Sequence, residues 1–483
     1  MIEEVRTRTR LPRSSPEDQG VVSGSVIKFI DSVQKEQREL HSLMILRHGH
    51  VIAEGWWHPY RRDLRHMLYS LSKSFTSTAV GMAVQEGHLS VADKVISFFP
   101  DLNPDSPSTN LSLMTVKDLL TMSTGHETEP NLWNSENWVQ GFLAHPVDHV
   151  PGTKFLYNTP ATYMLSAILH KLTGQSLLNY LNVRLFEPLG IVDATWETSP
   201  QGICTGGYGL SVRTEDIAKF GQLYLQSGVW EGKQLVSPDW VAEATSAVVP
   251  NGSEPNSDWN QGYGYQFWQC RHNAYRGDGA FGQNCIILPQ QDAVIVTTAG
   301  LGDLQALLNL CWEHLLSGMA SATSLPPSDE TQPLSERLAK LELAMPGGAS
   351  ESTDYAPRLN GKTYFFSKNE YGWQSVCVEF LDGQLKFCLI NKDGTHEVVA
   401  GIGVWVDGIT EMWPAGPISA CAKWVEKNDL VIRIAHAETP YVNSYTLKFK
   451  ESGLEMTRDL SASFGPTHFG PVAAAHEPVT SSL

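Results

Sequence analysis

The sequence lacks several features that define whole classes of protein. Its 483 residues contain no run of about 18 apolar residues, the length that a membrane-spanning helix needs. The N-terminal stretch MIEEVRTRTRLPRSSPEDQG carries charges where a secretory signal peptide has an apolar core. From these two absences we predict no membrane partner and a cytoplasmic location.

Positive charge is also scarce. Lys and Arg together number 35 against 52 Asp and Glu, which gives a formal net charge of -17 at pH 7. The densest basic stretch, PYRRDLRH at residues 59–66, is short. Because a chain of this charge repels a phosphate backbone, we predict no nucleic-acid partner.

The motifs of several enzyme classes are missing. The seven cysteines include no Cys-x-x-Cys pair, and the sequence has no His-Glu-x-x-His, no phosphate-binding loop and no Gly-x-Ser-x-Gly elbow. Residues 277–282 fit Gly-x-Gly-x-x-Gly, but the pattern after them continues as strand, turn and strand, whereas a dinucleotide site needs a helix there. We therefore predict no metal and no cofactor.

The order of the hydrophobic patterns predicts an α+β fold. Residues 41–57 are typical of a hairpin, and strand patterns return only at 262–270, 274–289 and 292–300. Mostly helical patterns fill the interval. We predict one antiparallel sheet, made from the first hairpin and the late strands, flanked by helices and interrupted by a helical insertion.

The C-terminal part of the chain has a different character. Residues 321–357 are rich in Pro, Gly and Ser around a short helical segment, which is typical of a linker. From residue 358 on, short alternating segments with Asp-Gly turns predict an antiparallel β domain, either a small barrel or a sandwich. The expected division is a first domain at 1–320, a linker at 321–357 and a β domain at 358–483.

One recurring pattern suggests chemistry. Ser-x-x-Lys occurs at Ser25/Lys28, Ser32/Lys35 and Ser70/Lys73. The first two pairs belong to residues 25–38, where the apolar residues form one helical stripe and the lysines lie outside it. The third pair begins a segment, SKSFTSTAVGMAV, that is apolar or small on nearly every face and predicts a buried helix.

A buried pair of this kind is suited to nucleophilic catalysis. One helical turn places the Lys73 amine within reach of the Ser70 hydroxyl, which needs a base to become a nucleophile. An unperturbed lysine has a pKa of about 10.4, so Lys73 must lose its solvation, or lie next to a cation or a group that shares its proton, to accept a proton at neutral pH. Tyr157 stands just before a helix for which we predict Thr159 as the N-cap and Pro160 as the first residue.

Three short motifs in this order resemble those of a known superfamily. They are SLSK at 70–73, YNT at 157–159 and GDG at 277–279. Together they are similar to the motifs of the serine β-lactamase and penicillin-binding-protein superfamily, with class C β-lactamases and related esterases and peptidases as the nearest branch. The resemblance covers roughly residues 15–318. Some peptidases of this superfamily carry a lipocalin-like barrel after the catalytic domain.

The resemblance assigns roles to individual residues. It implies a β-lactamase/transpeptidase-like fold in which Ser70 is the acylated nucleophile and Lys73 its proton acceptor. Tyr157 is the shared base or the proton donor to the leaving group, and the residues do not decide between Lys73 and Tyr157 as the working base. The backbone N–H groups of Ser70 and Ala280 would form the oxyanion hole.

Two departures from the family pattern concern substrate binding. The second motif has Asn158 and Thr159 where the family has a residue of any type followed by Asn. The third motif has Gly277, followed by Asp278 and Gly279, where the family begins with Lys or His. A substrate carboxylate thus loses its usual cation, and Arg276, one step along a strand, is expected on the opposite face.

These features predict a serine hydrolase that acts on a small-molecule ester or amide. Neutral esters are favoured, and β-lactam hydrolysis is disfavoured. A D-aminopeptidase or amidase, an acyltransferase and a penicillin-binding-type sensor without turnover remain alternatives. The β domain is expected to shape the cleft, to mediate formation of a homodimer or only to stabilise the first domain.

Overall fold

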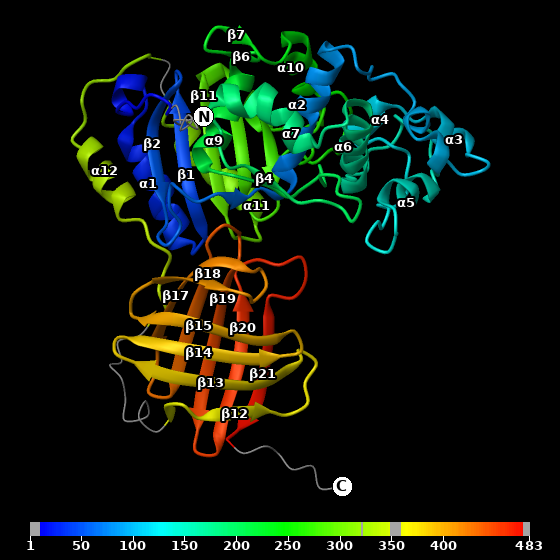
Figure 1. The fold of residues 1–483 in the computed structure, drawn as a ribbon. Helices are drawn as coiled ribbons and strands as arrows, with labels where there is room; N and C mark the ends of the chain where they lie inside the picture. Colours follow the sequence, from blue (N-terminus) through cyan, green and yellow to red (C-terminus); the bar gives the residue numbers. More distant parts are fainter. Residues whose placement is uncertain (1–9, 320–321, 348–358, 477–483) are drawn as a thin grey trace, which may run out of the picture.

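The computed structural model describes residues 10–319, 322–347 and 359–476, and they form two bodies that lie end to end (Figure 1). The upper body contains a six-stranded sheet with helices on both faces, and the lower body is a β barrel. No helix in the described part of the chain is both long enough and apolar enough to cross a membrane. The predicted α+β class, with a C-terminal antiparallel β domain, is confirmed.

The six-stranded sheet joins the first hairpin to the late strands, as predicted. Its order is β2-β1-β11-β10-β9-β8, and all neighbours are antiparallel. The strands are β1 (Leu40–Arg47), β2 (His50–Trp56), β8 (Trp268–Gln269), β9 (Tyr275–Gly279), β10 (Gln283–Leu288) and β11 (Ala293–Ala299). Because β8 and β9 are at one edge, the third motif lies at the open side of the sheet.

Both faces of this sheet are buried, because successive side chains of a strand point to opposite sides. Leu43 and Ile45 face α1 (Ser23–Lys35), α11 (Leu304–Leu310) and the π-helical turn η8 (Cys311–Leu316). Met44 and Leu46 belong to the hydrophobic cluster of the opposite face, which is shared with the helical insertion. The early and late parts of the chain are therefore held together by two separate cores.

The helical insertion lies on the side of the sheet away from α1 (Figure 1). Its helices are α2 (Ser72–Gln85), α3 (Thr109–Leu113), α4 (Val116–Leu120), α5 (Trp138–Ala144), α6 (Thr159–Thr173), α7 (Leu177–Leu181), α8 (Glu187–Leu189), α9 (Thr214–Leu225) and α10 (Pro238–Ala244), with the short turns η2 (Tyr69–Leu71), η3 (Val95–Phe98), η4 (Pro100–Leu102) and η5 (Asn182–Phe186). Outside the insertion, η1 (Glu17–Gln19) precedes α1, η6 (Arg271–Asn273) joins β8 to β9, and η7 (Pro289–Gln291) joins β10 to β11. Two small sheets pair β3 (His66–Met67), β4 (Thr195–Trp196) and β5 (Leu210–Val212), and β6 (Val229–Trp230) with β7 (Lys233–Gln234).

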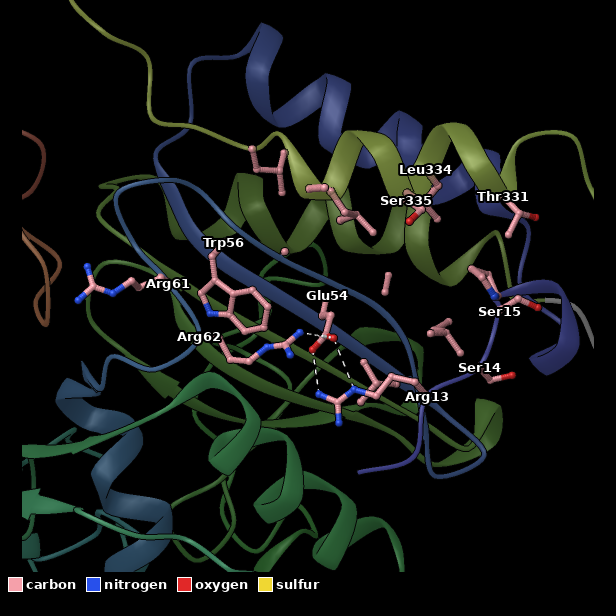
Figure 2. A pocket seen from close by; sticks show the side chains of 18 of the residues that line it. Arg13, Ser14, Ser15, Glu54, Trp56, Arg61, Arg62, Thr331, Leu334 and Ser335 are labelled. Carbon is pink, nitrogen blue, oxygen red and sulfur yellow. Dashed lines mark hydrogen bonds and ion pairs between the residues drawn. The ribbon is translucent and has the colours of Figure 1, made fainter. Parts of the chain in front are cut away.

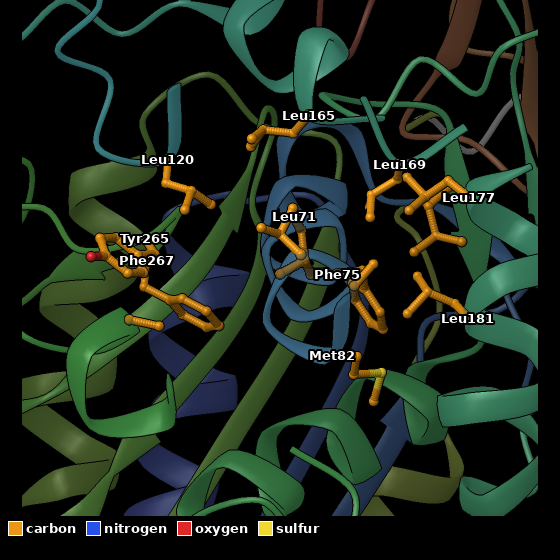
Figure 3. Packing of buried hydrophobic residues seen from close by; sticks show 14 of the residues in the cluster. Leu71, Phe75, Met82, Leu120, Leu165, Leu169, Leu177, Leu181, Tyr265 and Phe267 are labelled. Atoms are coloured by element: carbon orange, nitrogen blue, oxygen red, sulfur yellow. The ribbon is translucent and has the colours of Figure 1, made fainter. Parts of the chain in front are cut away.

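Helix α2 is buried on almost every face, as its sequence predicts. Every residue from Ser72 to Ala83 is buried. Figure 3 shows the helix in the middle of the insertion core, where Phe75 points towards Leu169 of α6 and Leu177 of α7. A charged group near the start of this helix has little contact with water, which matters for Lys73.

The lower body is a closed antiparallel barrel whose buried side chains form a cluster of their own. Its strands are β12 (Thr363–Phe366), β13 (Trp373–Leu381), β14 (Gln384–Asn391), β15 (Gly394–Ile402), β17 (Gly416–Trp424), β18 (Asp429–His436), β19 (Val442–Lys450), β20 (Gly453–Leu460) and β21 (His468–Ala475). A short parallel pairing of β15 with β17 closes the ring, and β16 (Val406–Thr410) pairs with β17 outside it.

The segment between the two bodies is partly ordered against the first. Helix α12 (Thr331–Ala339) packs on α1 and β2. Figure 2 shows the pocket that α12 and β2 line together. Leu334 of this helix is buried in the core on the α1 side of the sheet. The domain boundaries that we expect from the sequence stay a prediction, but the predicted short helix of the linker lies on the sheet rather than in solvent.

Candidate active site

A pocket of about 1130 Å³ brings the three motifs together. Ser70, Tyr157, Thr159, Asp278 and Ala280 all line it. They come from η2, from the start of α6 and the residues just before it, and from strand β9, next to the edge strand β8, with the turn that follows β9. Residues of the barrel line the same pocket, so the site lies where the two bodies meet.

Ser70 and Lys73 are joined by a hydrogen bond. Lys73 Nζ donates to Ser70 Oγ at 2.9 Å, to the Gly207 carbonyl at 2.8 Å and to Thr159 Oγ1 at 3.3 Å. The 3-10 turn η2 precedes α2, so that Ser70 stands one turn before Lys73 at the head of the buried helix. The predicted nucleophile and base are therefore within proton-transfer distance.

The same burial changes the protonation of Lys73. The residue is 1% exposed, and desolvation lowers the pKa of its amine from 10.5 to about 7, a shift that the nearby Glu129 and Asp278 carboxylates oppose. An appreciable fraction of the protein then carries a neutral amine near neutral pH. This meets the condition that the sequence set for Lys73 to accept a proton.

Tyr157 lies over the same pair of residues. The Lys73 ammonium nitrogen is 4.8 Å from the centroid of the Tyr157 ring, which stacks on Trp268 with 5.3 Å between centroids. Burial raises the pKa of the Tyr157 hydroxyl above its ordinary value, and its hydrogen bond with Ser70 opposes this shift. The phenol thus remains protonated near neutral pH while it contacts the nucleophile.

The structure corrects our assignment of the second motif by one residue. Asn158, not Thr159, is the N-cap of α6: its side-chain oxygen accepts from the Ala161 N–H at 3.1 Å, and it is fully buried away from the pocket. Thr159 is the first residue of the helix and Pro160 the second. The proposed contact of Asn158 with substrate is not supported, because capping already uses this amide.

Gly277 and Gly279 also do not line the pocket. A Cβ on Gly277 would lie 2.3 Å from a Leu71 methyl carbon, and one on Gly279 would lie 2.0 Å from the Leu68 carbonyl oxygen. Both glycines therefore let β9 approach the turn that carries Ser70. In this structure they bring the strand and the nucleophile turn together, and their predicted contact with substrate stays a prediction.

Asp278 is the residue of the third motif that reaches the pocket. Its carboxylate accepts from Arg276 Nε at 2.9 Å, because residues two apart on a strand share a face. Arg276 is fully buried beside the Trp259 ring, at 4.4 Å from its centroid. Arg276 thus shares the face of Asp278 and pairs with its carboxylate, but it is not among the residues that line the pocket.

The proposed oxyanion hole has unusual backbone on both sides. Ala280 lines the pocket, and within the described residues its N–H donates to no acceptor. Tyr69, just before Ser70, and Phe281, just after Ala280, have left-handed φ angles of 48° and 70°. Such angles are uncommon for aromatic residues and concentrate at functional sites.

Several pocket residues were not predicted from the sequence. They are Trp133, Glu129, Glu197 and Tyr208 of the insertion and Trp413, Tyr441 and Phe464 of the barrel. No local pattern marks them, since each reaches the pocket through tertiary contacts. The glycine-rich segment around Tyr208 was visible as a turn, but nothing in it indicated that the Gly207 carbonyl would accept from Lys73.

The other Ser-x-x-Lys pairs and the other large pocket offer no similar arrangement. The Ser25 hydroxyl donates to the Val22 carbonyl, and Ser32 bonds with His314. A pocket of about 640 Å³ beneath α12 is crossed by ion pairs of Arg13 and Arg62 with Glu54 (Figure 2). Ser70 is therefore the nucleophile candidate that the geometry supports.

Comparison with known proteins identifies the family of the first body. Residues 28–303 match the family model described as Beta-lactamase. The 6-aminohexanoate-dimer hydrolase of Paenarthrobacter ureafaciens is 27% identical over 308 residues, which are 58% of this chain and 76% of that protein. The lovastatin esterase of Penicillium rubens is 28% identical over 170 residues, 30% of this chain and 42% of that protein.

Solved structures share the fold. A putative 6-aminohexanoate-dimer hydrolase from Bacillus anthracis has a TM-score of 0.50 at 19% identity and covers 68% of this chain and 86% of its own. A putative β-lactamase from Bacteroides dorei has a TM-score of 0.52 at 15% identity, with 61% and 99% covered. The family match spans more than half of the chain and contains all three motifs, and so this protein belongs to the Beta-lactamase family of hydrolases.

Proposed function

We propose that this protein is a serine hydrolase that cleaves neutral esters through an acyl-enzyme on Ser70. The observation that carries the proposal is the buried Lys73 amine, 2.9 Å from the Ser70 hydroxyl, beside a large pocket. Its relatives include one named lovastatin esterase and one named 6-aminohexanoate-dimer hydrolase. The absence of a basic side chain among the described lining residues disfavours a carboxylate substrate.

In the proposed acylation step, Ser70 Oγ attacks the substrate carbonyl carbon while its proton passes to the neutral Lys73 amine. The carbonyl oxygen takes up negative charge and accepts hydrogen bonds from the N–H groups of Ser70 and Ala280. The tetrahedral intermediate then expels the alcohol, which takes the proton from the Lys73 ammonium group, either directly or through Tyr157, so that Lys73 is neutral again. The raised pKa of Tyr157 keeps its hydroxyl protonated, which disfavours it as the base, and the lowered pKa of Lys73 supports the amine as the base.

Deacylation repeats these steps with water in place of Ser70. Lys73 again accepts a proton, now from the attacking water, and Ser70 leaves the acyl carbon and recovers its own proton. The products are a carboxylic acid and a free enzyme. An anionic product is then repelled by the Asp278 and Glu129 carboxylates, which favours its release.

The test is direct detection of the acyl-enzyme. Wild-type protein is mixed with p-nitrophenyl esters and with D-amino-acid p-nitroanilides, quenched in acid and measured by intact mass. We expect a mass increase equal to the acyl group, located by peptide mapping on Ser70, together with sustained release of p-nitrophenol. An adduct at another residue, or neither adduct nor turnover across the panel, contradicts the proposal. An adduct without turnover would favour a sensor.

The pH dependence of the reaction follows from the lowered pKa of Lys73. The active form has a neutral amine, so kcat/KM is expected to rise about tenfold per pH unit below pH 7 and to level off above it. Because the pKa of Tyr157 is raised, its ionisation should cause no decrease of kcat/KM within the measured pH range. The measurement is kcat/KM for p-nitrophenyl acetate between about pH 5 and 9, with spontaneous hydrolysis subtracted. A profile that is flat across neutrality would contradict Lys73 as the base.

A second candidate activity is hydrolysis of amides that carry a free amine. Glu129, Glu197 and Asp278 put three carboxylates in the pocket lining. Glu129 also accepts a hydrogen bond from the Thr159 N–H at 2.7 Å, which holds its carboxylate close to the start of α6 and the nucleophile. An ammonium group on the substrate would be attracted to this acidic lining.

Replacing Glu129 with Gln tests this candidate. We expect kcat/KM for an ω-aminoacyl p-nitroanilide to fall about tenfold, because one attractive carboxylate is lost, while its N-acetylated analogue changes by less than about twofold. The comparison is made near pH 9, where Lys73 is neutral in both proteins. Glu127→Gln, in the same loop but outside the pocket lining, is the matched control. Equal losses for the charged and acetylated substrates would contradict an ammonium site.

A further inference from the structure

Exposed aromatic side chains gather at one place on the described surface. Of the large hydrophobic residues that are exposed, the aromatic ones are Trp133 at 71%, Trp413 at 66% and Phe464 at 76%. All three line the pocket that contains Ser70. Large aromatic surfaces left in water are unusual in a soluble protein and mark binding sites when they cluster in a cavity.

Two of these residues belong to the barrel, not to the first body. Trp413 lies in the loop between β16 and β17, and Phe464 lies in the loop between β20 and β21. These loops are at the end of the barrel that faces the six-stranded sheet (Figure 1). The active-site pocket therefore has a wall that the Beta-lactamase family region, residues 28–303, does not supply.

Contacts between the bodies hold this wall in place. The hydroxyl groups of Tyr69 and Tyr441 share a hydrogen bond, and Phe464 packs on Phe281 with 4.7 Å between ring centroids. Trp413 packs on Tyr441 at 5.2 Å. Both loops are thus tied to the residues that flank Ser70 and Ala280, so they lie beside the reacting atoms.

The contacts of the barrel with the first body are also polar. The Met67 N–H donates to the Glu438 carbonyl at 2.8 Å, and Arg65 forms an ion pair with the Glu438 side chain. Met67 itself lines the pocket. Because these contacts cross the boundary next to the nucleophile turn, the wall is a fixed part of the pocket in this structure.

The chemistry of the lining limits what this wall would bind. It combines exposed aromatic rings with carboxylates, and no Lys, Arg or His is among the described lining residues. Aromatic faces bind apolar groups and attract cations, whereas carboxylates repel anions. A volume of about 1130 Å³ admits a group much larger than acetyl.

We propose that Trp413 and Phe464 of the barrel, together with Trp133 of the insertion, bind a large apolar portion of the substrate that is uncharged or cationic. The barrel is then a specificity-determining part of the active site rather than only a support. The inference rests on the proposed hydrolysis for the reaction that the bound substrate undergoes. Binding of an apolar group to these aromatic residues can be tested without that reaction.

A kinetic experiment compares two esters that share a leaving group. For Trp413→Ala and Phe464→Ala we expect kcat/KM for p-nitrophenyl 4-phenylbutyrate to fall about 10- to 100-fold, while that for p-nitrophenyl acetate stays within about threefold. Ile409→Ala is the matched control, because Ile409 is a barrel residue, 77% exposed and outside the pocket lining. Equal effects on both esters, or none on either, would overturn the inference.

A binding experiment separates this inference from the proposed function. In the Ser70→Ala background, calorimetry measures the affinity for 2-naphthalenemethanol, 2-naphthylmethylamine and 2-naphthoate. We expect the alcohol and amine to bind at least about tenfold more tightly than the anion, and Trp413→Ala or Phe464→Ala to weaken them at least about tenfold.

The outcomes of the two experiments are distinguishable. Binding that depends on the aromatic residues, together with a wild-type protein that forms no acyl-enzyme with the ester and anilide panel, overturns the proposed function and supports this inference. Turnover through Ser70 with naphthyl binding unchanged by the substitutions overturns this inference alone. If light scattering instead shows a wild-type dimer that Trp413→Ala and Phe464→Ala dissociate, without any change in binding, the aromatic residues form an interface between copies and the inference is wrong.

Discussion

Replacing Ser70 with alanine is expected to lower kcat for p-nitrophenyl esters by about 10⁴-fold or more, which would be the largest effect of any single substitution in the pocket. The reason is that no acyl-enzyme can form without the hydroxyl that Lys73 contacts at 2.9 Å. Ser70 is only partly buried, in a short turn, so the change should leave the melting temperature nearly unaffected. Steady-state kinetics and thermal unfolding measure the two quantities.

Ser32→Ala is the matched control for this prediction. Ser32 stands in the same sequence pattern with Lys35, but its hydroxyl bonds with His314 on the far side of the sheet from α2. This variant should retain wild-type turnover. If Ser70→Ala retained more than about a hundredth of the wild-type rate after contaminating esterases are excluded, another nucleophile would carry the reaction.

The central pair could be predicted from the sequence because its geometry is local. A spacing of three residues at the head of a helix places two side chains together whatever the rest of the fold does. The choice of Ser70 over the two earlier serines rested on burial, since only its helix is apolar on nearly every face. The structure bears this out, with every residue from Ser72 to Ala83 buried.

The substrate-binding assignments were less successful for a physical reason. The motif pattern gives the order of residues but not their orientation, and a shift of one residue at a helix start changes which side chain caps it. Asn158 is a better N-cap than Thr159 and takes that position, which leaves the Thr159 hydroxyl next to Lys73. Gly277 and Gly279 allow the nucleophile turn to approach β9 closely, a contact that the motif pattern alone does not reveal.

The barrel wall was beyond sequence reasoning. Trp413 and Phe464 are more than 340 residues from Ser70 in the chain, and no pattern of either segment says where its loop will lie. A β domain that shapes the cleft was one of three expectations for the C-terminal region. Only the packing of the two bodies shows that its loops reach the pocket. Long-range contacts of this kind depend on the whole fold.

Burial of the Lys73 amine opposes folding, although the same burial lowers its pKa and so supports its proposed role as a base. The amine has a pKa of about 7 in the folded protein and about 10.5 in the unfolded chain, so the unfolded state binds more protons between these two values. The free energy of unfolding therefore rises with pH across this window. Below about pH 7 the amine is charged in both states, so its desolvation lowers the free energy of unfolding by the full amount, on the order of a few kcal/mol.

Replacing Lys73 with methionine should consequently abolish activity and stabilise the protein. We expect kcat to fall about 10³-fold or more, because the base is lost, and the melting temperature near pH 6.5 to rise by several degrees. The loss of the hydrogen bond to the Gly207 carbonyl offsets part of this gain. Steady-state kinetics and thermal unfolding at about pH 6.5 and 9.5 measure both effects.

The pH dependence of the stability difference identifies its cause. The gain over wild type should shrink as pH rises from 7 towards 10.5, because the folded amine is neutral in this window and the free energy needed to remove its proton falls as the pH approaches the unfolded pKa. Lys35→Met, at an exposed lysine of α1, should change neither activity nor the pH dependence. A Lys73→Met protein that is less stable than wild type at pH 6.5 would instead mean that the lysine holds the site together. A site built for proton transfer should become more stable when its buried base is removed, since burial of that base opposes folding.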